Sequence, residues 1–150
     1  MPFMQTILCA VDFSEGSPEV AEYAASLATA TGATVVCLYV APSLAEYVGF
    51  SVPQASLDHV VDDVVASAED SMAAFTGEHF KGLSVRGVVR AGYPAEEILR
   101  AAVENHADVI VMGTHGRTGF DRMLFGSVAE KVVTAAECPV LTIKPHPSAV

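Results

Sequence analysis

Five short apolar runs alternate with four stretches of helical periodicity, and this alternation constrains the fold more than any other feature of the sequence. The apolar runs have the length and composition of buried strands, and they lie at residues 6–13, 34–41, 83–91, 107–113 and 139–144. Strands that alternate with helices form a parallel sheet whose two faces are both covered. The sequence therefore predicts an α/β fold.

The helical stretches carry start and stop signals. Ser17 and Pro18 are typical of an N-cap and a first helical position, and Gly32 is typical of a helix end. The other helices are expected at about residues 57–79, from Pro94 onward, and at about 127–137. Residues 42–56 hold two prolines and a glycine without a clear period, which indicates a long loop.

Right-handed crossovers make such a five-stranded sheet doubly wound, and we expect the strand order 3-2-1-4-5 in a single domain over residues 1–150. In this order, strands 1 and 4 are neighbours at the point where the order reverses. Ligands of open parallel sheets bind at the carboxyl ends of the strands at that point. The expected site is formed by residues 10–13 (AVDF) and 113–116 (GTHG).

Composition limits the classes of partner. A net charge of −10 argues against nucleic acid, whose phosphates attract lysine and arginine. No apolar run approaches the roughly 18 residues of a membrane span, and the N-terminus lacks the cationic region of a signal peptide. Cys9, Cys37 and Cys138 lie in or beside apolar runs, as buried, reduced thiols do. We therefore expect a cytoplasmic protein without a membrane or nucleic-acid partner.

The segment GTHGRTGFDRMLFGS, residues 113–127, links the fourth strand to the last helix and contains four glycines. Such links usually take about 2–6 residues. Gly113 and Gly116 permit positive φ angles and close backbone approach, and free N–H groups at the helix start beside Gly126 favour an anion. Arg122 adds a positive charge. The segment predicts a phosphate-binding loop, although its spacing is neither that of a P-loop nor that of a dinucleotide fingerprint.

Other polar residues have simpler interpretations. Ser127 and Glu130 are spaced as a capping box, so Ser127 serves to start the helix, either alone or together with phosphate binding. Gly92 either turns the chain from strand to helix or borders a ligand. No histidine pair has the spacing of a zinc motif. The adjacent acids Asp62-Asp63 and Glu96-Glu97 are expected to solvate helix faces.

The glycine spacing G-x2-G-x9-G-S after VIVMG, together with ILCAVDFSEGS near the N-terminus and CPVLTIK near the C-terminus, resembles the universal stress protein family. The likeness covers essentially the whole chain and is to the group that keeps the glycine motif and binds ATP. It implies the doubly wound sheet, a homodimer and a ligand that is ATP, ADP or AMP. Mg²⁺ or Mn²⁺ bridging the phosphates would accompany ATP.

The resemblance also assigns residues to the ligand. Asp12 matches an aspartate that contacts the nucleoside, which agrees with its charge, because a carboxylate would repel phosphate. Its expected partners are the adenine amine, the ribose hydroxyls or a divalent cation; the alternative is a turn residue after the strand. The remaining positions are Ala10 and Val40 at the base, Met112 and Gly113 at the ribose, Gly116, Gly126, Ser127 and Val128 at the phosphates, and His115 and Arg117 in the same loop.

Three functions are compatible with these features. A nucleotide-binding regulatory module that responds to stress and signals to a protein partner is favoured. A slow ATPase or nucleotidyl-transferring enzyme would need a base, for which His115 and Asp121 are candidates. An interaction module that no longer uses nucleotide is disfavoured by the intact glycine motif. The apolar edge strand at residues 139–144 predicts a homodimer, because pairing with a second copy would cover it.

Overall fold

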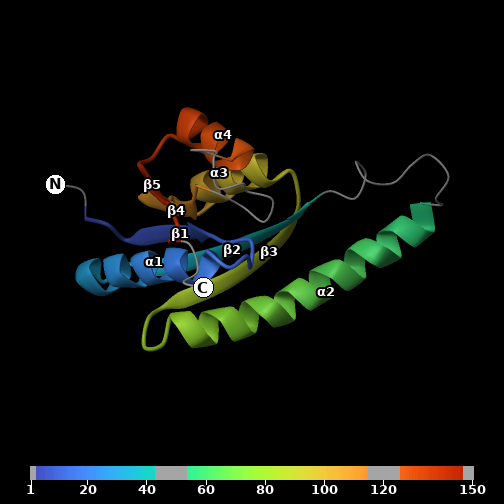
Figure 1. The fold of residues 1–150 in the computed structure, drawn as a ribbon, viewed down its shortest axis with the longest axis horizontal. Coiled ribbons are helices and arrows are strands. Elements are labelled where there is room, and N and C mark those ends of the chain that lie inside the picture. The colour runs from blue at the N-terminus through green and yellow to red at the C-terminus, as the bar shows by residue number, and fades with distance from the viewer. Residues whose placement is uncertain (1–2, 43–53, 115–125, 147–150) are drawn as a thin grey trace.

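Five parallel strands form one sheet in the order β3-β2-β1-β4-β5, which confirms the predicted fold class and topology (Figure 1). The structure is a computed structural model, and it describes residues 3–42, 54–114 and 126–146. The elements along the chain are β1 (Thr6–Ala10), α1 (Ser17–Thr31), β2 (Thr34–Pro42), α2 (Gln54–His79), β3 (Val85–Gly92), α3 (Pro94–Glu104), β4 (Val109–Gly113), α4 (Ser127–Ala135) and β5 (Val140–Ile143).

Helices cover both faces of the sheet (Figure 1). Alternate residues of β1 show how the core divides: Ile7 and Cys9 pack with apolar residues of α1 and α2, whereas Leu8 and Ala10 pack with those of α3 and α4. All four are buried. A strand whose side chains are buried on both sides must be apolar at every position, which is why the strands read as continuous apolar runs.

The predicted N-cap of α1 was wrong by one residue, whereas the predicted start of α4 at Ser127 is confirmed. The N-caps of α1 and α4 are Gly16 and Gly126, and neither helix has a side-chain cap hydrogen bond. Ser17 and Ser127 are instead the first residues of their helices, so the predicted capping box at Ser127 is not formed. The predicted end of α1 is confirmed, since Gly32 has a φ of 75° and its N–H donates to the Ala28 carbonyl.

The cysteines carry free thiols, and two of them are buried. Cys9 and Cys37 are neighbours across β1 and β2, and the hydrogen bond between them, together with burial, raises the pKa of Cys9 well above its usual value. Cys138 is half-buried, which differs from the prediction. Within the described ranges, no helix is long and apolar enough to cross a membrane, and no group of His, Cys, Asp or Glu is placed to hold a metal ion.

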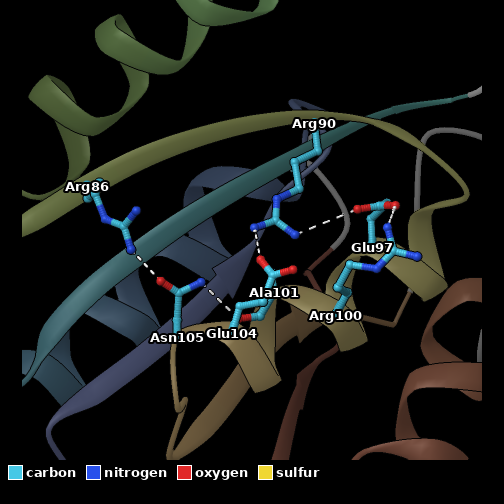
Figure 2. Close-up of polar contacts among 7 residues, drawn as sticks. All are labelled: Arg86, Arg90, Glu97, Arg100, Ala101, Glu104 and Asn105. Carbon is cyan, nitrogen blue, oxygen red and sulfur yellow. Dashed lines mark hydrogen bonds and ion pairs between the residues drawn. The ribbon is translucent and has the colours of Figure 1, made fainter.

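A polar network ties the edge strand β3 to α3 (Figure 2). Arg90 lies 2.6 Å from Glu104 and 3.7 Å from Glu97, and Glu97 also pairs with Arg100 at 2.8 Å. The Glu97 side chain is only 13% exposed. The expectation that Glu97 solvates a helix face was therefore wrong, because α3 turns it towards the arginine of β3; Glu96, by contrast, is exposed.

Candidate functional site

The predicted site residues come from strands that end at one edge of the sheet. Ala10, the last residue of β1, is in register with Leu38 of β2 on one side and with Met112 of β4 on the other. The order of strands reverses between β1 and β4, as predicted. The carboxyl edge of β1, β2 and β4 is therefore the place where this fold offers a binding crevice.

Four of the predicted residues belong to one apolar cluster on the face covered by α3 and α4. Ala10, Val40 and Met112 are buried, and Val128 of α4 packs against the same cluster as a half-buried residue. They come from three strands and one helix, yet they lie together because parallel strands bring their carboxyl ends to one edge. We call these four residues the apolar floor of the candidate site.

Asp12 follows directly after β1 and is held by the chain that comes next. One carboxylate oxygen, Oδ1, accepts hydrogen bonds from the Ser14 N–H at 3.0 Å and from the Ser17 hydroxyl at 3.1 Å. No hydrogen bond to the other oxygen, Oδ2, is found in the part of the chain that the structure describes. Asp12 therefore serves as a turn residue and still presents one acceptor oxygen.

Phe13, next to Asp12, adopts a left-handed backbone conformation with a φ of 59°. This conformation costs an aromatic residue about 1–2 kcal/mol. The Phe13 ring lies 4.7 Å from the Tyr39 ring and 5.7 Å from the Phe75 ring, between centroids, so aromatic packing holds it in place. The strained turn directs the chain away from the sheet immediately after the Asp12 carboxylate.

The start of α4 is tied to the end of β4 through Thr114. The Thr114 N–H donates to the Ile143 carbonyl of β5 at 2.8 Å, and the Gly126 N–H donates to the Thr114 carbonyl at 2.6 Å. Thr114 is buried, with 6% of its surface exposed. These bonds place the first turn of α4 at the same edge of the sheet as Asp12, and they occupy the Gly126 N–H within the protein.

The next N–H groups of α4 have no acceptor within the helix. The first intrahelical bond runs from the Glu130 N–H to the Gly126 carbonyl at 3.0 Å, so the N–H groups of Ser127, Val128 and Ala129 have no backbone acceptor among the residues that the structure describes. Ser127 is exposed. Gly126 has an extended conformation (φ −71°, ψ 162°), which does not require glycine.

Part of the predicted site lies outside the described residues. His115, Gly116, Arg117 and Arg122 fall within residues 115–125, between Thr114 and Gly126. Gly113 is described and pairs with Ile143 as the last residue of β4. The two ends of the glycine loop are thus fixed on the sheet edge.

Gly92 lies further along the same edge. Its φ is 152°. Gly92 is in register with Pro42 of β2, and β2 lies between β3 and β1. A Cβ atom at Gly92 would lie 3.0 Å from Cγ of Glu97. Its side-chain-free backbone therefore serves the close approach of β3 and α3, which supports the turn interpretation.

Two residues of this edge were not identified from the sequence. Ser17 was interpreted as a helix cap, but its hydroxyl donates to Asp12 and the side chain is buried. Thr114 was passed over, although it joins β5 to the start of α4. The sequence did hold a signal for both, because each is a polar residue close in sequence to a predicted ligand residue. Ser17 is five positions after Asp12, and Thr114 directly follows Gly113.

Comparison with known proteins decides the family. The model of the universal stress protein family matches residues 4–144. This chain belongs to the universal stress protein family. It is 34% identical over 140 residues to the universal stress protein MJ0531 of Methanocaldococcus jannaschii, a match that covers 92% of this chain and 81% of that protein.

Solved structures of the family share the fold. The M. jannaschii protein MJ0577, determined in a study of structure-based assignment of function, superposes with a TM-score of 0.86 at 26% identity, covering 98% of this chain and all of that chain. The universal stress protein of Archaeoglobus fulgidus in complex with dAMP has a TM-score of 0.66 at 23% identity, with 96% of this chain and all of that chain covered. At this identity the second likeness concerns the fold.

Proposed function

We propose that this universal stress protein is a regulatory module that binds ATP, with ADP or AMP as alternative ligands, at the carboxyl edge of β1, β2 and β4. The observation that carries the proposal is the meeting of three chemically different elements at that edge. They are the apolar floor, the acceptor oxygen of Asp12 and the first turn of α4. An adenine nucleotide has a part suited to each of them.

Each element matches one part of the nucleotide. The apolar floor suits the nucleoside, with Ala10 and Val40 at the adenine ring and Met112 at the ribose. Oδ2 of Asp12 would accept a hydrogen bond from a ribose hydroxyl or the adenine amine. The N–H groups of Ser127 and Val128, at the positive end of the helix dipole, would donate to phosphate oxygens.

The remaining motif residues complete the proposal. Gly116 would continue the phosphate cradle, with His115 and Arg117 beside it, while Gly113 would allow close approach of the ribose. A bridging Mg²⁺ or Mn²⁺ would be held largely by phosphate oxygens and water, as Mg²⁺ commonly is. The A. fulgidus fold relative, solved with dAMP, supports an adenine nucleotide as a ligand class that this fold accommodates. Free cysteines fit the cytoplasmic location that we propose.

Calorimetric and thermal titrations test the binding. ATP with Mg²⁺ at about 100 times its Kd is expected to stabilise the protein by about 2.7 kcal/mol, because only the folded state binds. Separate titrations with ADP, AMP and GTP rank the nucleotides, and GTP serves as the matched control for the base. Absence of both binding heat and a thermal shift at millimolar ATP would overturn the proposal.

We also propose that the protein forms a homodimer through β5. The Ile110 N–H donates to the Pro139 carbonyl and the Thr114 N–H to the Ile143 carbonyl, so these β5 residues face β4. Because successive residues of a strand point their N–H and C=O groups in opposite directions, those of Thr142 face the free edge. Leu141 beside it is 39% exposed, as an apolar edge awaiting a partner would be.

Thr142→Pro tests the dimer without touching the bonds to β4. Proline lacks the N–H that would pair with the second copy but is tolerated on an edge strand. Thr142→Pro is expected to sediment as a monomer, whereas Thr142→Ala, which keeps the N–H, remains a dimer like the parent. A parent protein that is monomeric at micromolar concentration contradicts this part of the proposal.

A further inference from the structure

The loop at residues 12–17, here called the Asp12 loop, holds its carboxylate unusually firmly. Oδ1 of Asp12 accepts hydrogen bonds from the Ser14 N–H and the Ser17 hydroxyl, while Oδ2 accepts none from the residues that the structure describes. The two donors differ in kind. The Ser14 bond closes a local turn, whereas the Ser17 hydroxyl reaches back from the first residue of α1 and is buried, with 3% of the residue exposed.

The strained backbone of Phe13 indicates that the position of the neighbouring Asp12 carboxylate is important for function. Phe13 keeps a left-handed backbone that an aromatic residue rarely adopts, and its ring is packed against Tyr39 of β2 and Phe75 of α2. Strained backbone that the surrounding structure over-determines is concentrated at functional sites. Here it lies directly beside Asp12, the residue that follows β1 at the sheet edge.

The far end of the loop is held by the chain after β5. Pro145 lies against Gly16 so closely that a Cβ atom on the glycine would be 2.6 Å from the proline Cγ. The His146 N–H donates to Oε2 of Glu19, in the first turn of α1, at 2.8 Å. The Asp12 loop is therefore fixed from inside by Ser17 and the Phe13 ring, and from outside by the C-terminal segment.

We infer that Ser17 is a positioning residue for the ligand: its hydroxyl holds Oδ1 so that Oδ2 of Asp12 is already oriented for the nucleoside. This inference rests on the proposed function. A carboxylate fixed before binding loses little side-chain freedom when the ligand arrives, which increases affinity. Without the hydroxyl, the carboxylate would keep only the Ser14 bond and could rotate away from the ligand.

A double-mutant cycle tests whether Ser17 acts through Asp12. Dissociation constants for adenosine and for Mg²⁺-ATP are measured with the parent, Ser17→Ala, Asp12→Ala and the double variant. Ser17→Ala is expected to weaken both ligands about 5- to 10-fold. In the Asp12→Ala background, the same change is expected to have no further effect on affinity, although it still lowers the melting temperature.

Two controls separate positioning from stability. Ser17→Thr keeps the hydroxyl and is expected to bind within about twofold of the parent. Ala25→Gly weakens the middle of α1 without approaching Asp12, and it is expected to lower the melting temperature while leaving both affinities unchanged.

The outcomes distinguish the two proposals. If the parent binds ATP but Ser17→Ala binds equally well, or weakens binding equally with and without Asp12, then Ser17 is not a positioning residue and the proposed function stands. If Ala25→Gly weakens the ligands as much as Ser17→Ala does, the effect is one of stability and the inference fails. If the parent binds neither adenosine nor ATP, the proposed function and this inference both fall.

Discussion

Two Gly-Ser pairs begin helices at the same edge of the sheet, and they have opposite surroundings. Gly16 and Ser17 begin α1 after β1, and Gly126 and Ser127 begin α4 after the loop that follows β4. Ser17 is buried and donates to Asp12, whereas Ser127 is exposed. The same dipeptide therefore begins one helix with a buried, hydrogen-bonded serine and the other helix with an exposed serine.

This difference gives the N-terminal ends of α1 and α4, which are both positive ends of helix dipoles, different electrostatic surroundings. At α1, the chain brings its own carboxylates, because Asp12 approaches the first turn and Glu19 lies within it. α4 also has an acid in its first turn, the exposed Glu130, but no carboxylate accepts a hydrogen bond from this turn within the residues that the structure describes. A phosphate would be repelled by Asp12 at α1 and attracted by the free donors at α4. The nucleotide is therefore expected to lie with its nucleoside near α1 and its phosphates near α4.

Substitution of the two glycines is expected to give the largest contrast. Gly126→Val should weaken ATP at least about 30-fold, since a branched side chain would block phosphate from the first turn of α4. The extended backbone of Gly126 accepts valine, so circular dichroism should show an intact fold. Calorimetry with ATP and with adenosine measures the effect, and adenosine should be affected less.

Gly16→Val is the matched control at the other helix. Its side chain would collide with Pro145, so the variant should lose about 1–3 kcal/mol of stability and still bind ATP within a few-fold of the parent. Parent-like ATP binding by Gly126→Val would show that the phosphates do not lie at α4.

A smaller effect is expected when the start of α4 is given a carboxylate, as the start of α1 has. Ser127→Asp places a carboxylate in the first turn of α4, where it should stabilise the protein by about 0.3–1 kcal/mol through the helix dipole. The same charge should weaken ATP about tenfold through repulsion and leave adenosine unchanged. Ser127→Asn, which has the same shape without the charge, should bind ATP like the parent. Equal losses for Asp and Asn would show that shape, not charge, governs this position.

The sequence predicted the sheet and its order because those follow from period and handedness. Strand boundaries were less accurate: β1 ends at Ala10, although the predicted strand extends to Phe13. The cause is the left-handed backbone of Phe13, which neither its residue type nor hydrophobic periodicity indicates. The sequence pattern extends the strand through this phenylalanine, whereas the Ser14–Asp12 hydrogen bond and the packing of the ring on Tyr39 and Phe75 form a turn there.

The sequence predicted where the candidate site residues lie better than it predicted the contacts among them, and their roles toward a ligand stay predictions. Asp12 and the four residues of the apolar floor follow from the family motif and the switch point, and the structure places them at one edge. Ser17 matches a helix cap in sequence, because Ser-Pro before an apolar period is the usual signal. Its bond to Asp12 depends on the turn at Phe13. The ion pairs of Glu97 were hidden for the same reason, since pattern does not show which residues of β3 face α3.

The smallest expected effect concerns the contact between His146 of the C-terminal segment and Glu19 of α1. Hydrogen bonds from the His146 backbone N–H and ring lower the pKa of Glu19. A carboxyl group whose pKa is lower in the folded protein stabilises it fully above the unfolded value, near 4.3 for glutamate, and this contribution is lost as the pH falls below that value through the folded pKa. Stability from this contact should therefore be present at pH 7 and decline below about pH 4.3.

Urea denaturation at pH 7 and at pH 3.5 measures this contribution. Glu19→Gln should lower the stability relative to the parent at pH 7, and the difference should be smaller at pH 3.5, below the unfolded pKa of glutamate, where the contribution declines. Other carboxylates titrate in the same range, notably Asp108, whose pKa is lowered by the N–H groups of Gln5 and Thr6, so the difference between parent and variant is the quantity compared. ATP affinity at pH 7 should not change, because Glu19 faces the C-terminal segment. A Glu19→Gln protein with the parent's stability at both pH values would show that the His146–Glu19 contact does not stabilise α1. In that case, the Asp12 loop is fixed only by Ser17 and the Phe13 ring.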